Sequence, residues 1–166
     1  CALADRTATA NGLTDRLITL PCDLRDRRQL PPAGRFDLAV SNPPYFPAGG
    51  GKTAAGSRGI HRAELACTME QLCAAAAYLL RSGGQFCLVY RTERLAELME
   101  TLRRHRLEPK VLRFVQKNAA SAPSLLLMAC RKDGGTGLTV QPPLLLQNGD
   151  GTETPELRRI YFKEKG

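Results

Sequence analysis

Apolar residues along this chain occur either in short continuous runs or at helical spacing. Three runs, 17–21 (LITLP), 36–41 (FDLAVS) and 85–90 (QFCLVY), have the length and composition of buried strands. Segments 68–80 and 92–105 instead place apolar side chains at i, i+3, i+4 and i+7, the spacing of an amphipathic helix. Strands that alternate with such helices predict an α/β protein with a mostly parallel sheet.

Several helix ends are marked by capping residues. Thr68 and Gln71 fit a capping box at the start of the first long helix, and Gly83-Gly84 is expected to end it. Near the C-terminus, Thr154 followed by Pro155 predicts the start of a short helix, because proline is favoured at the first helical position.

Two further apolar runs, 110–116 and 124–130, are separated only by a short loop. They predict an antiparallel hairpin at one edge of the sheet. A chain of 166 residues is long enough for one domain with a real core, so we expect residues 1–166 to form a single domain.

Net charge, cysteine spacing and the length of apolar stretches indicate which partners and which location to expect. The formal net charge is +8 and the pI about 9.5, which favours a polyanionic partner such as nucleic acid. None of the six cysteines forms a C-x-x-C pair, so we expect no metal site, and cysteines within apolar runs indicate a reducing, cytoplasmic location. No apolar stretch reaches the ~18 residues that span a membrane, so we expect no membrane partner.

Residues 41–56 (SNPPYFPAGGGKTAAG) carry two candidate motifs. Gly51-Lys52-Thr53 resembles the end of a phosphate-binding loop, which requires a glycine five residues before Gly51. That position is Phe46, and the residues that follow are Ala- and Gly-rich rather than helical. The spacing therefore excludes this loop, and the segment from 49 to 59 reads as a loop beside the other motif.

The second motif, Asn42-Pro43-Pro44-Tyr45, directly follows an apolar strand, where open α/β sheets bind their ligands. An exocyclic amine on a base is a poor nucleophile because its lone pair is delocalised into the ring. Two acceptors, the side-chain carbonyl of Asn42 and the backbone carbonyl of Pro43, can draw the nitrogen toward tetrahedral geometry. Tyr45 offers a flat face for a base that has left its stack. An ordinary Pro-rich turn is the alternative interpretation.

These residues resemble a known motif. FDLAVSNPPY is similar to motif IV of the class I S-adenosylmethionine-dependent methyltransferases that methylate exocyclic or amide nitrogens, and LITLPCDLRD resembles the third strand and acidic position of that fold. The tail PPLLLQNGDGTETPELRRIY is similar to the C-terminus of the tRNA adenine-N6 methyltransferases that act on valine tRNA. The resemblance implies a Rossmann-like fold and transfer of a methyl group from S-adenosylmethionine to the N6 of an adenine in tRNA.

The resemblance also implies roles for individual residues. The catalytic turn would be formed by Asn42, Pro43, Pro44 and Tyr45. The methyl donor would be contacted by Asp23, Leu24 and Asn42, with Asp23 at the adenine of the donor. The nucleic-acid substrate would be contacted by Tyr45, Arg58 and Arg62.

Part of the family's pattern has no counterpart in this sequence. The first strand with its Gly-rich donor-binding turn does not occur, nor does the acidic residue that closes the second strand. We therefore expect an incomplete catalytic domain without its first two strands, which alone binds the donor weakly or not at all and is inactive. The remaining sheet would have an exposed apolar edge, which a longer parent protein or a homodimer through that edge would cover.

Other functions are compatible with the same residues. Asn-Pro-Pro-Tyr also serves the methylation of DNA adenine, of another RNA base or of a protein Gln amide. Without the donor loop, the chain is alternatively a non-catalytic RNA-binding fragment. The basic run 103–106 (RRHR) is then a candidate for phosphate contacts.

Overall fold

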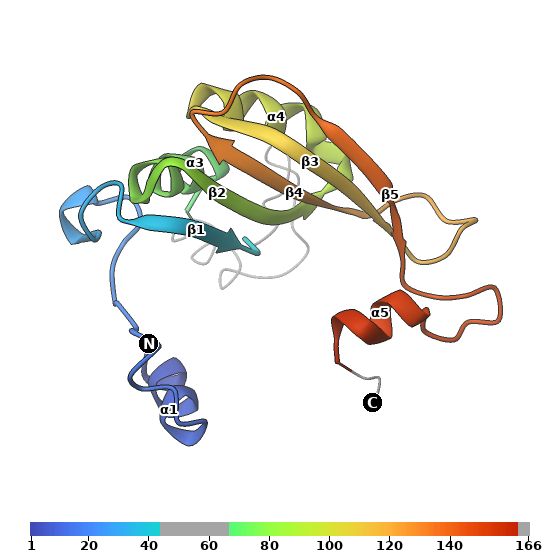
Figure 1. The fold of residues 1–166 in the computed structure, drawn as a ribbon, viewed down its shortest axis with the longest axis horizontal. Helices are drawn as coiled ribbons and strands as arrows, with labels where there is room; N and C mark the ends of the chain where they lie inside the picture. The colour runs from blue at the N-terminus through green and yellow to red at the C-terminus, as the bar shows by residue number, and fades with distance from the viewer. Residues whose placement is uncertain (44–66, 163–166) are drawn as a thin grey trace, which may run out of the picture.

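The computed structural model describes residues 1–43 and 67–162, and its centre is a five-stranded sheet in the order β1-β2-β4-β3-β5 (Figure 1). The strands are β1 (Phe36–Ser41), β2 (Leu80–Arg91), β3 (Leu107–Gln116), β4 (Leu125–Lys132) and β5 (Thr139–Leu145). The pairs β1–β2 and β3–β5 are parallel, whereas β4 is antiparallel to both of its neighbours, β2 and β3. Four strands thus share one direction, which confirms the predicted mostly parallel sheet with an antiparallel hairpin.

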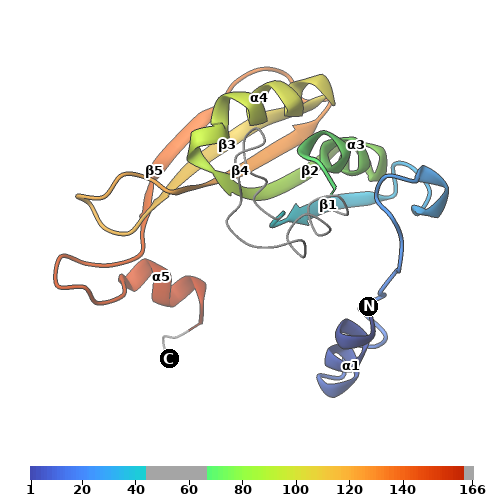
Figure 2. The ribbon, with the colours of Figure 1, turned by 180° about the vertical axis from the view of Figure 1, so that it is seen from behind.

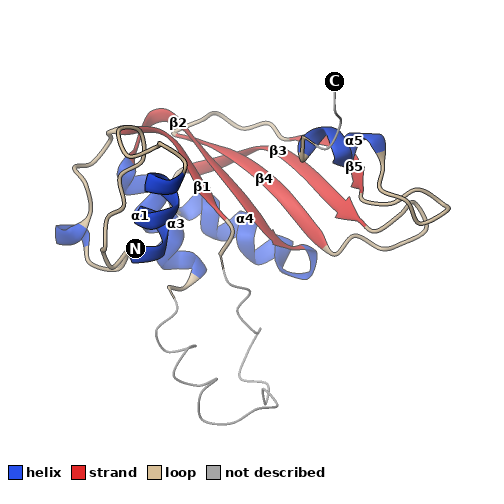
Figure 3. Cartoon of the chain, turned by 90° about the horizontal axis from the view of Figure 1, so that it is seen from below, coloured by secondary structure: helices blue, strands red, loops and turns tan. Residues whose placement is uncertain are grey.

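Two helices cover one face of the sheet. α3 (Met69–Leu79) and α4 (Leu95–Arg104) lie across this face, as Figures 2 and 3 show. The predicted capping box is present: the Gln71 N–H donates to Thr68 Oγ1 at 3.2 Å, and the Thr68 N–H donates to Gln71 Oε1 at 2.8 Å. α4 is preceded by one turn of 3-10 helix, Thr92–Arg94, where the sequence predicted a single helix.

The other helices lie at the ends of the chain. α1 (Ala2–Ala10) lies apart from the sheet, and α5 (Pro155–Ile160) lies on the side of the sheet opposite to α3 and α4 (Figures 1 and 3). A short 3-10 helix, Arg27–Gln29, precedes β1. The predicted cap of α5 is confirmed, since the Leu157 N–H donates to Thr154 Oγ1 at 3.2 Å. Among the described helices, none has the length and hydrophobicity that crossing a membrane requires.

The core fills the space between the sheet and the α3–α4 layer. Phe86, Leu88 and Tyr90 of β2 are buried there, because every second side chain of a strand points to the same face. α4 adds Leu98 and Leu102, which are fully buried and lie one helical turn apart. The rest of this core comprises Met69, Cys73, Ala76, Leu80, Leu107, Leu112, Leu126, Met128 and Cys130.

The opposite face of the sheet, here called the open face, has no described helix over its centre (Figure 3). Cys87 and Val89, the residues of β2 between the buried ones, are only partly buried there. On the neighbouring β1, Leu38 and Val40 are 52% and 73% exposed. The apolar pattern of the strands thus continues onto a surface that the described residues leave accessible.

One predicted strand is absent. The LITLP segment at 17–21 forms no β-ladder, and Leu17, Ile18 and Leu20 are exposed. A strand is stable only when neighbouring backbone groups accept and donate its hydrogen bonds, and within the described residues β1 pairs on one side only, with β2. Apolar composition predicted a strand in this segment, but it carries no information on whether a neighbouring strand is present to pair with it.

The C-terminal hairpin is formed, but it is not at the edge of the sheet as predicted. β5 pairs in parallel with β3 and takes the edge position. Its sequence, TVQPPLL, contains Pro142 and Pro143, which lack N–H donors and therefore argue against a central strand. An edge strand tolerates them, and the register of β5 against β3 shifts at this point, between Arg113 and Val115.

Gly83 and Gly84 do not end α3 as predicted. α3 ends at Leu79 and passes directly into β2, so both glycines lie within that strand. A Cβ on Gly84 would lie 2.9 Å from the Arg81 carbonyl oxygen and 3.2 Å from the Phe36 carbonyl oxygen, and Gly83 has φ +77°. The glycines therefore permit a close backbone approach at the start of β2 rather than a helix stop.

Candidate active site

The motif predicted to carry the chemistry lies at the carboxyl edge of the sheet. β1, β2, β3 and β5 all end at this edge, and Asn42 and Pro43 directly follow β1. Ligands of open α/β sheets bind outside the carboxyl ends of the strands. The position of Asn42 therefore agrees with a role in binding.

Asn42 is exposed and Pro43 is buried, so the turn presents the amide while its proline anchors it. Ser41, the last residue of β1, is paired with Leu88 in the adjacent strand, which fixes where the turn begins. The other proposed residues of the turn and of substrate binding, namely Pro44, Tyr45, Arg58 and Arg62, lie outside the described residues.

Two of the three residues predicted to contact the donor line a common cavity, and the third, Asn42, does not line it. Asp23 and Leu24 belong to a cavity of about 500 Å³ whose other lining residues are Pro21, Cys22, Arg25 and Cys67. Cys67 lies two residues before α3, whose C-terminus joins the start of β2. Because α3 has 11 residues and spans roughly 16 Å, its N-terminus extends toward the carboxyl edge of the sheet. The cavity thus belongs to the same side of the molecule as Asn42.

The Asp23 carboxylate is already engaged by a neighbour. Arg25 Nε and NH2 donate to its two oxygens at 2.9 and 2.7 Å. These hydrogen bonds lower the pKa of Asp23 to about 2, so the carboxylate is ionised at any physiological pH. A ligand that hydrogen-bonds to Asp23 must therefore bind beside the Arg25 guanidinium or displace it.

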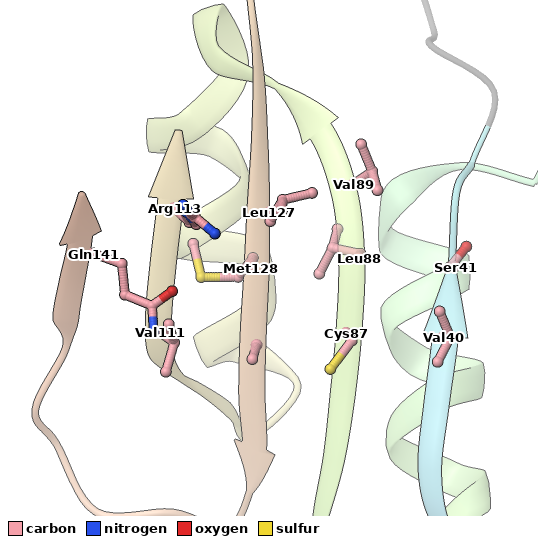
Figure 4. Close-up of a pocket in the computed structure, with 11 residues that line it drawn as sticks. Val40, Ser41, Cys87, Leu88, Val89, Val111, Arg113, Leu127, Met128 and Gln141 are labelled. Atoms are coloured by element: carbon pink, nitrogen blue, oxygen red, sulfur yellow. The ribbon is translucent and has the colours of Figure 1, made fainter. Parts of the chain in front are cut away.

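A trough of about 340 Å³ crosses the open face of the sheet (Figure 4). Register pairing places Val40, Cys87, Ala129 and Val111 in one row across β1, β2, β4 and β3. The next row toward the carboxyl edge contains Val89, Leu127, Arg113 and Gln141. The trough is therefore apolar at the β1 end, next to the Asn42 turn, and polar at the β5 end.

Arg113 links this trough to α5. Its Nε donates to the Pro142 carbonyl oxygen at 2.9 Å, and its two terminal nitrogens contact Glu156 at 2.7 and 2.8 Å. The hydrogen bond from Arg113 is the main cause of the lowered pKa of Glu156. This fork between residues 43 positions apart in the sequence holds α5 against the sheet.

Tyr90 is a feature that the sequence analysis did not single out. It lies near the carboxyl end of β2 and is almost fully buried, yet within the described residues its hydroxyl has no hydrogen-bond partner. The Arg94 guanidinium lies 5.8 Å from the centre of its ring. Burial raises the pKa of the hydroxyl, which therefore stays protonated. A tyrosine that ends an apolar run is the only signal the sequence offered.

The basic run at 103–106 is not a free phosphate-binding patch. Each of its four side chains has a carboxylate partner. The pairs are Arg103–Glu108 (3.3 Å), Arg104–Glu70 (3.0 Å), Arg104–Glu100 (2.6 Å), His105–Glu70 (2.7 Å) and Arg106–Asp133 (2.8 Å). No group of side chains among the described residues could hold a metal ion.

Solved structures with a similar fold are methyltransferases. A predicted O-methyltransferase from Agrobacterium tumefaciens superposes with a TM-score of 0.75 at 20% identity, over 96% of this chain and 70% of its own. The geranyl diphosphate C-methyltransferase of Streptomyces coelicolor, crystallised with S-adenosylhomocysteine, gives a TM-score of 0.53 at 12% identity, over 79% of this chain and 60% of its own. This chain has the Rossmann-like methyltransferase fold.

A third similar structure comes from a restriction-modification system. It is described as a modification subunit of a type I restriction enzyme from Vibrio vulnificus, with a TM-score of 0.54 and 15% identity over 97% of this chain and 37% of its own. The chain thus spans 37% to 70% of the length of these three structures. A scan of protein-family models and a search of curated protein sequences found no match.

Proposed function

We propose that this chain carries the amine-holding part of an S-adenosylmethionine-dependent methyltransferase that acts on the N6 of an adenine in tRNA, in the cytoplasm. The observation that carries the proposal is the place of Asn42-Pro43. This pair follows β1 at the carboxyl edge of a methyltransferase-like sheet, with the Asn42 side chain exposed and Pro43 anchored.

The chemistry follows from the acceptors that this turn provides. The Asn42 side-chain oxygen and the Pro43 carbonyl oxygen accept hydrogen bonds from the two N–H groups of the adenine amine. The nitrogen lone pair is then free to attack the donor methyl carbon in line with the leaving sulfur. The N–C bond forms as the C–S bond breaks, the sulfonium becomes a neutral thioether, and the amine proton is lost to water. Most of the rate enhancement would come from positioning.

We place part of the donor in the cavity beside Asp23, where it would bind next to the Arg25 guanidinium or displace it. A carboxylate accepts a hydrogen bond from an exocyclic amine, and the neighbouring Leu24 packs against a flat ring. We therefore assign the adenine of S-adenosylmethionine to Asp23 and Leu24, with Asn42 near its reactive end. The donor supplies the activated methyl group, and the protein residues hold and orient the two reactants.

A tRNA substrate is favoured by the net charge of +8 and by the resemblance of the C-terminal tail to tRNA adenine-N6 methyltransferases. Methylation of DNA adenine is the second candidate, because one similar structure is a restriction-modification subunit. A different RNA base, a protein Gln amide, and RNA binding without catalysis are further alternatives that the same assay separates.

The test is transfer of a labelled methyl group from S-adenosylmethionine to unmodified tRNA, with duplex DNA and a glutamine-containing peptide as parallel substrates. The complete gene product, its Asn42→Ala variant and the 166-residue chain would be compared. Asn11→Ala is the matched control, because Asn11 directly follows α1, which lies apart from the sheet. We expect labelled N6-methyladenosine from the complete protein and from Asn11→Ala only.

Other outcomes have defined meanings. Label in DNA or in the peptide but not in tRNA would replace the tRNA proposal by the corresponding alternative. Bound tRNA without any label would favour the non-catalytic RNA-binding reading. Equal activity of Asn42→Ala and the complete protein would remove the role assigned to the turn.

The free edge of β1 supports one further part of this proposal, a homodimer through that edge. β1 carries exposed apolar side chains, and within the described residues it pairs only with β2. We expect light scattering of the 166-residue chain to give the mass of two copies. A monomer mass that does not change with protein concentration would reject the dimer.

A further inference from the structure

The last described residues, 158–162 (RRIYF), form an exposed surface of mixed character, here called the C-terminal basic-aromatic surface. Ile160, Tyr161 and Phe162 are 48%, 65% and 93% exposed, and Arg158 and Arg159 are exposed beside them. Large apolar side chains at such exposure normally mark a contact surface when they are clustered. Here two adjacent arginines directly precede the three exposed apolar and aromatic residues, so the surface is part basic and part apolar.

This surface is held in a fixed place. Thr154, the cap of α5, donates its hydroxyl to the Leu145 carbonyl oxygen at 2.7 Å, and its N–H donates to the Leu146 carbonyl oxygen at 3.1 Å. Glu156 is held by the Arg113 fork described above. The start of α5 is therefore fastened to the end of β5, which lies at the same carboxyl edge of the sheet as Asn42.

The charges of the surface are available. Within the described part of the chain neither Arg158 nor Arg159 forms an ion pair. Arg158 interacts electrostatically with Asp150 and Arg159 with Glu156, but the Glu156 carboxylate itself pairs with Arg113. Two guanidinium groups beside exposed aromatic rings provide the two contacts that single-stranded nucleic acids use, phosphate pairing and base stacking.

We propose that the C-terminal basic-aromatic surface binds unpaired nucleotides of an RNA substrate on one side of the target base. This inference rests on the proposed function, because it takes the substrate to be a nucleic acid. Arg158 and Arg159 would contact phosphates, and Phe162 would stack on a base. The surface would then contribute affinity and register, while the Asn42 turn holds the base that reacts.

The dimensions suit such a division of labour. β1 and β5 are the outer strands of the sheet, separated by four interstrand steps of about 4.8 Å, or ~19 Å in all. Several consecutive nucleotides cover this distance. RNA is favoured over duplex DNA because its loops offer unpaired bases without the energetic cost of unstacking, and an exposed phenylalanine can stack only on an unpaired base.

The test is direct binding, without methyl donor, to a fluorescent single-stranded RNA of about 12 nucleotides, a length within the range of one single-strand binding site. The 166-residue chain would be titrated by anisotropy at several salt concentrations. Arg158→Gln/Arg159→Gln should weaken binding about tenfold and reduce the salt slope by ~1.4, since each single-strand phosphate contact contributes ~0.7. Phe162→Ala should weaken binding at least about fivefold, the value of roughly 1 kcal/mol of stacking.

Arg6→Gln/Arg16→Gln is the matched control, because it removes the same charge from exposed arginines in and just after α1, at the other end of the molecule (Figure 1). An RNA duplex of the same sequence has no unpaired base to stack on, so Phe162→Ala should leave the affinity for this duplex unchanged. Equal losses from the two double variants, or no loss from Phe162→Ala on single-stranded RNA, would overturn the proposal. Binding of single-stranded DNA or duplex DNA as tightly as RNA would overturn the choice of RNA.

The two proposals fail in different ways. RNA binding that depends on Phe162, without methyl transfer by the complete protein, would sink the proposed reaction and leave the surface standing. Methyl transfer to tRNA that is unaffected by Phe162→Ala and by Arg158→Gln/Arg159→Gln would support the proposed reaction and overturn the proposed role of the surface.

Discussion

Two arginine-rich segments of this protein look alike in the sequence but differ in their surroundings. At the end of α4, the run RRHR is matched by carboxylates from α3, from α4 itself and from the segments that follow it. In α5, Arg158 and Arg159 face solvent next to exposed aromatic rings. The first segment, with the higher density of positive charge, is the one whose charge is locally neutralised.

A basic run therefore indicates a nucleic-acid contact only when its side chains form no ion pairs with carboxylates of the same protein. Glu70 lies 34 residues before Arg104 and contacts both Arg104 and His105. Exposed pairs of this kind add little stability, with a median of about 0–1 kcal/mol, but they reduce the local positive potential. The α4 run thus contributes to the surface charge pattern of the fold rather than to a phosphate site.

The largest expected effect separates the two segments by burial. Leu102→Ala, in α4, should lower the free energy of unfolding by ~2–5 kcal/mol, because Leu102 is fully buried in the core. Leu157→Ala, in α5, should lower it by only about 1 kcal/mol, because Leu157 is half-buried. Urea unfolding followed by circular dichroism measures both. Equal losses would show that α5 is as much a part of the core as α4.

The next effect tests the fork that positions α5. Arg113→Gln should raise the opening of α5 about fivefold, because it removes a pair worth roughly 1 kcal/mol whose carboxylate is partly exposed. Amide hydrogen exchange over 155–160 reports this local opening. Arg106→Gln, which breaks the exposed pair with Asp133, is the control and should leave α5 unchanged. No change in exchange with Arg113→Gln would mean that Thr154 alone fixes the helix.

The same fork predicts a pH dependence. The pKa of Glu156 is lowered in the folded protein, chiefly by Arg113, from an ordinary value of 4.5. A lowered pKa means that the stabilisation is complete above pH 4.5 and is lost as the pH falls through the folded-state value. Hydrogen-exchange protection factors of α5 should therefore decrease on acidification below this pH. Glu156→Gln should make them independent of pH in that window, and an unchanged slope would rule out this origin.

The smallest expected effect is a gain of RNA affinity at the α4 run when its carboxylate partners are removed. Glu70→Gln/Glu100→Gln removes both carboxylates that face Arg104, so the α4 run should gain affinity for single-stranded RNA by about twofold to tenfold. Asp5→Asn/Asp15→Asn makes the same change in net charge near α1 and serves as the control. If the two double variants gain equally, the effect is one of net charge and the local pairing at α4 is irrelevant.

The sequence predicted those elements whose signals are local. β1 has the bounds that the FDLAVS run predicted, and both Thr68 and Thr154 cap their helices as expected. Prediction was wrong where the outcome depends on a distant partner. LITLP was predicted to be a strand but forms no ladder, and the edge strand TVQPPLL was not predicted at all.

The candidate site follows the same rule. The position of Asn42 and Pro43 directly after the strand β1 could be predicted, because strand and turn are contiguous in the sequence. The expected burial of this strand was wrong, because most of its residues are exposed. The Arg113–Glu156 fork and the buried Tyr90 hydroxyl were not, because the fork joins residues far apart in the chain and the burial of Tyr90 depends on the packing of α3 and α4. The roles assigned to all the site residues stay predictions; these residues are Asp23, Leu24, Asn42, Pro43, Pro44, Tyr45, Arg58 and Arg62.

Sequence patterns alone were enough to predict the alternation of strands and helices, the caps of α3 and α5, and the place of Asn42 and Pro43 directly after β1. These features arise from residues within a few positions of one another, through side-chain periodicity and local hydrogen bonds. The three-dimensional fold determines which apolar runs pair as strands, which arginines form ion pairs, and where α5 lies. Those outcomes depend on partners brought together by folding, because hydrogen bonds and ion pairs act over distances in space and not along the chain.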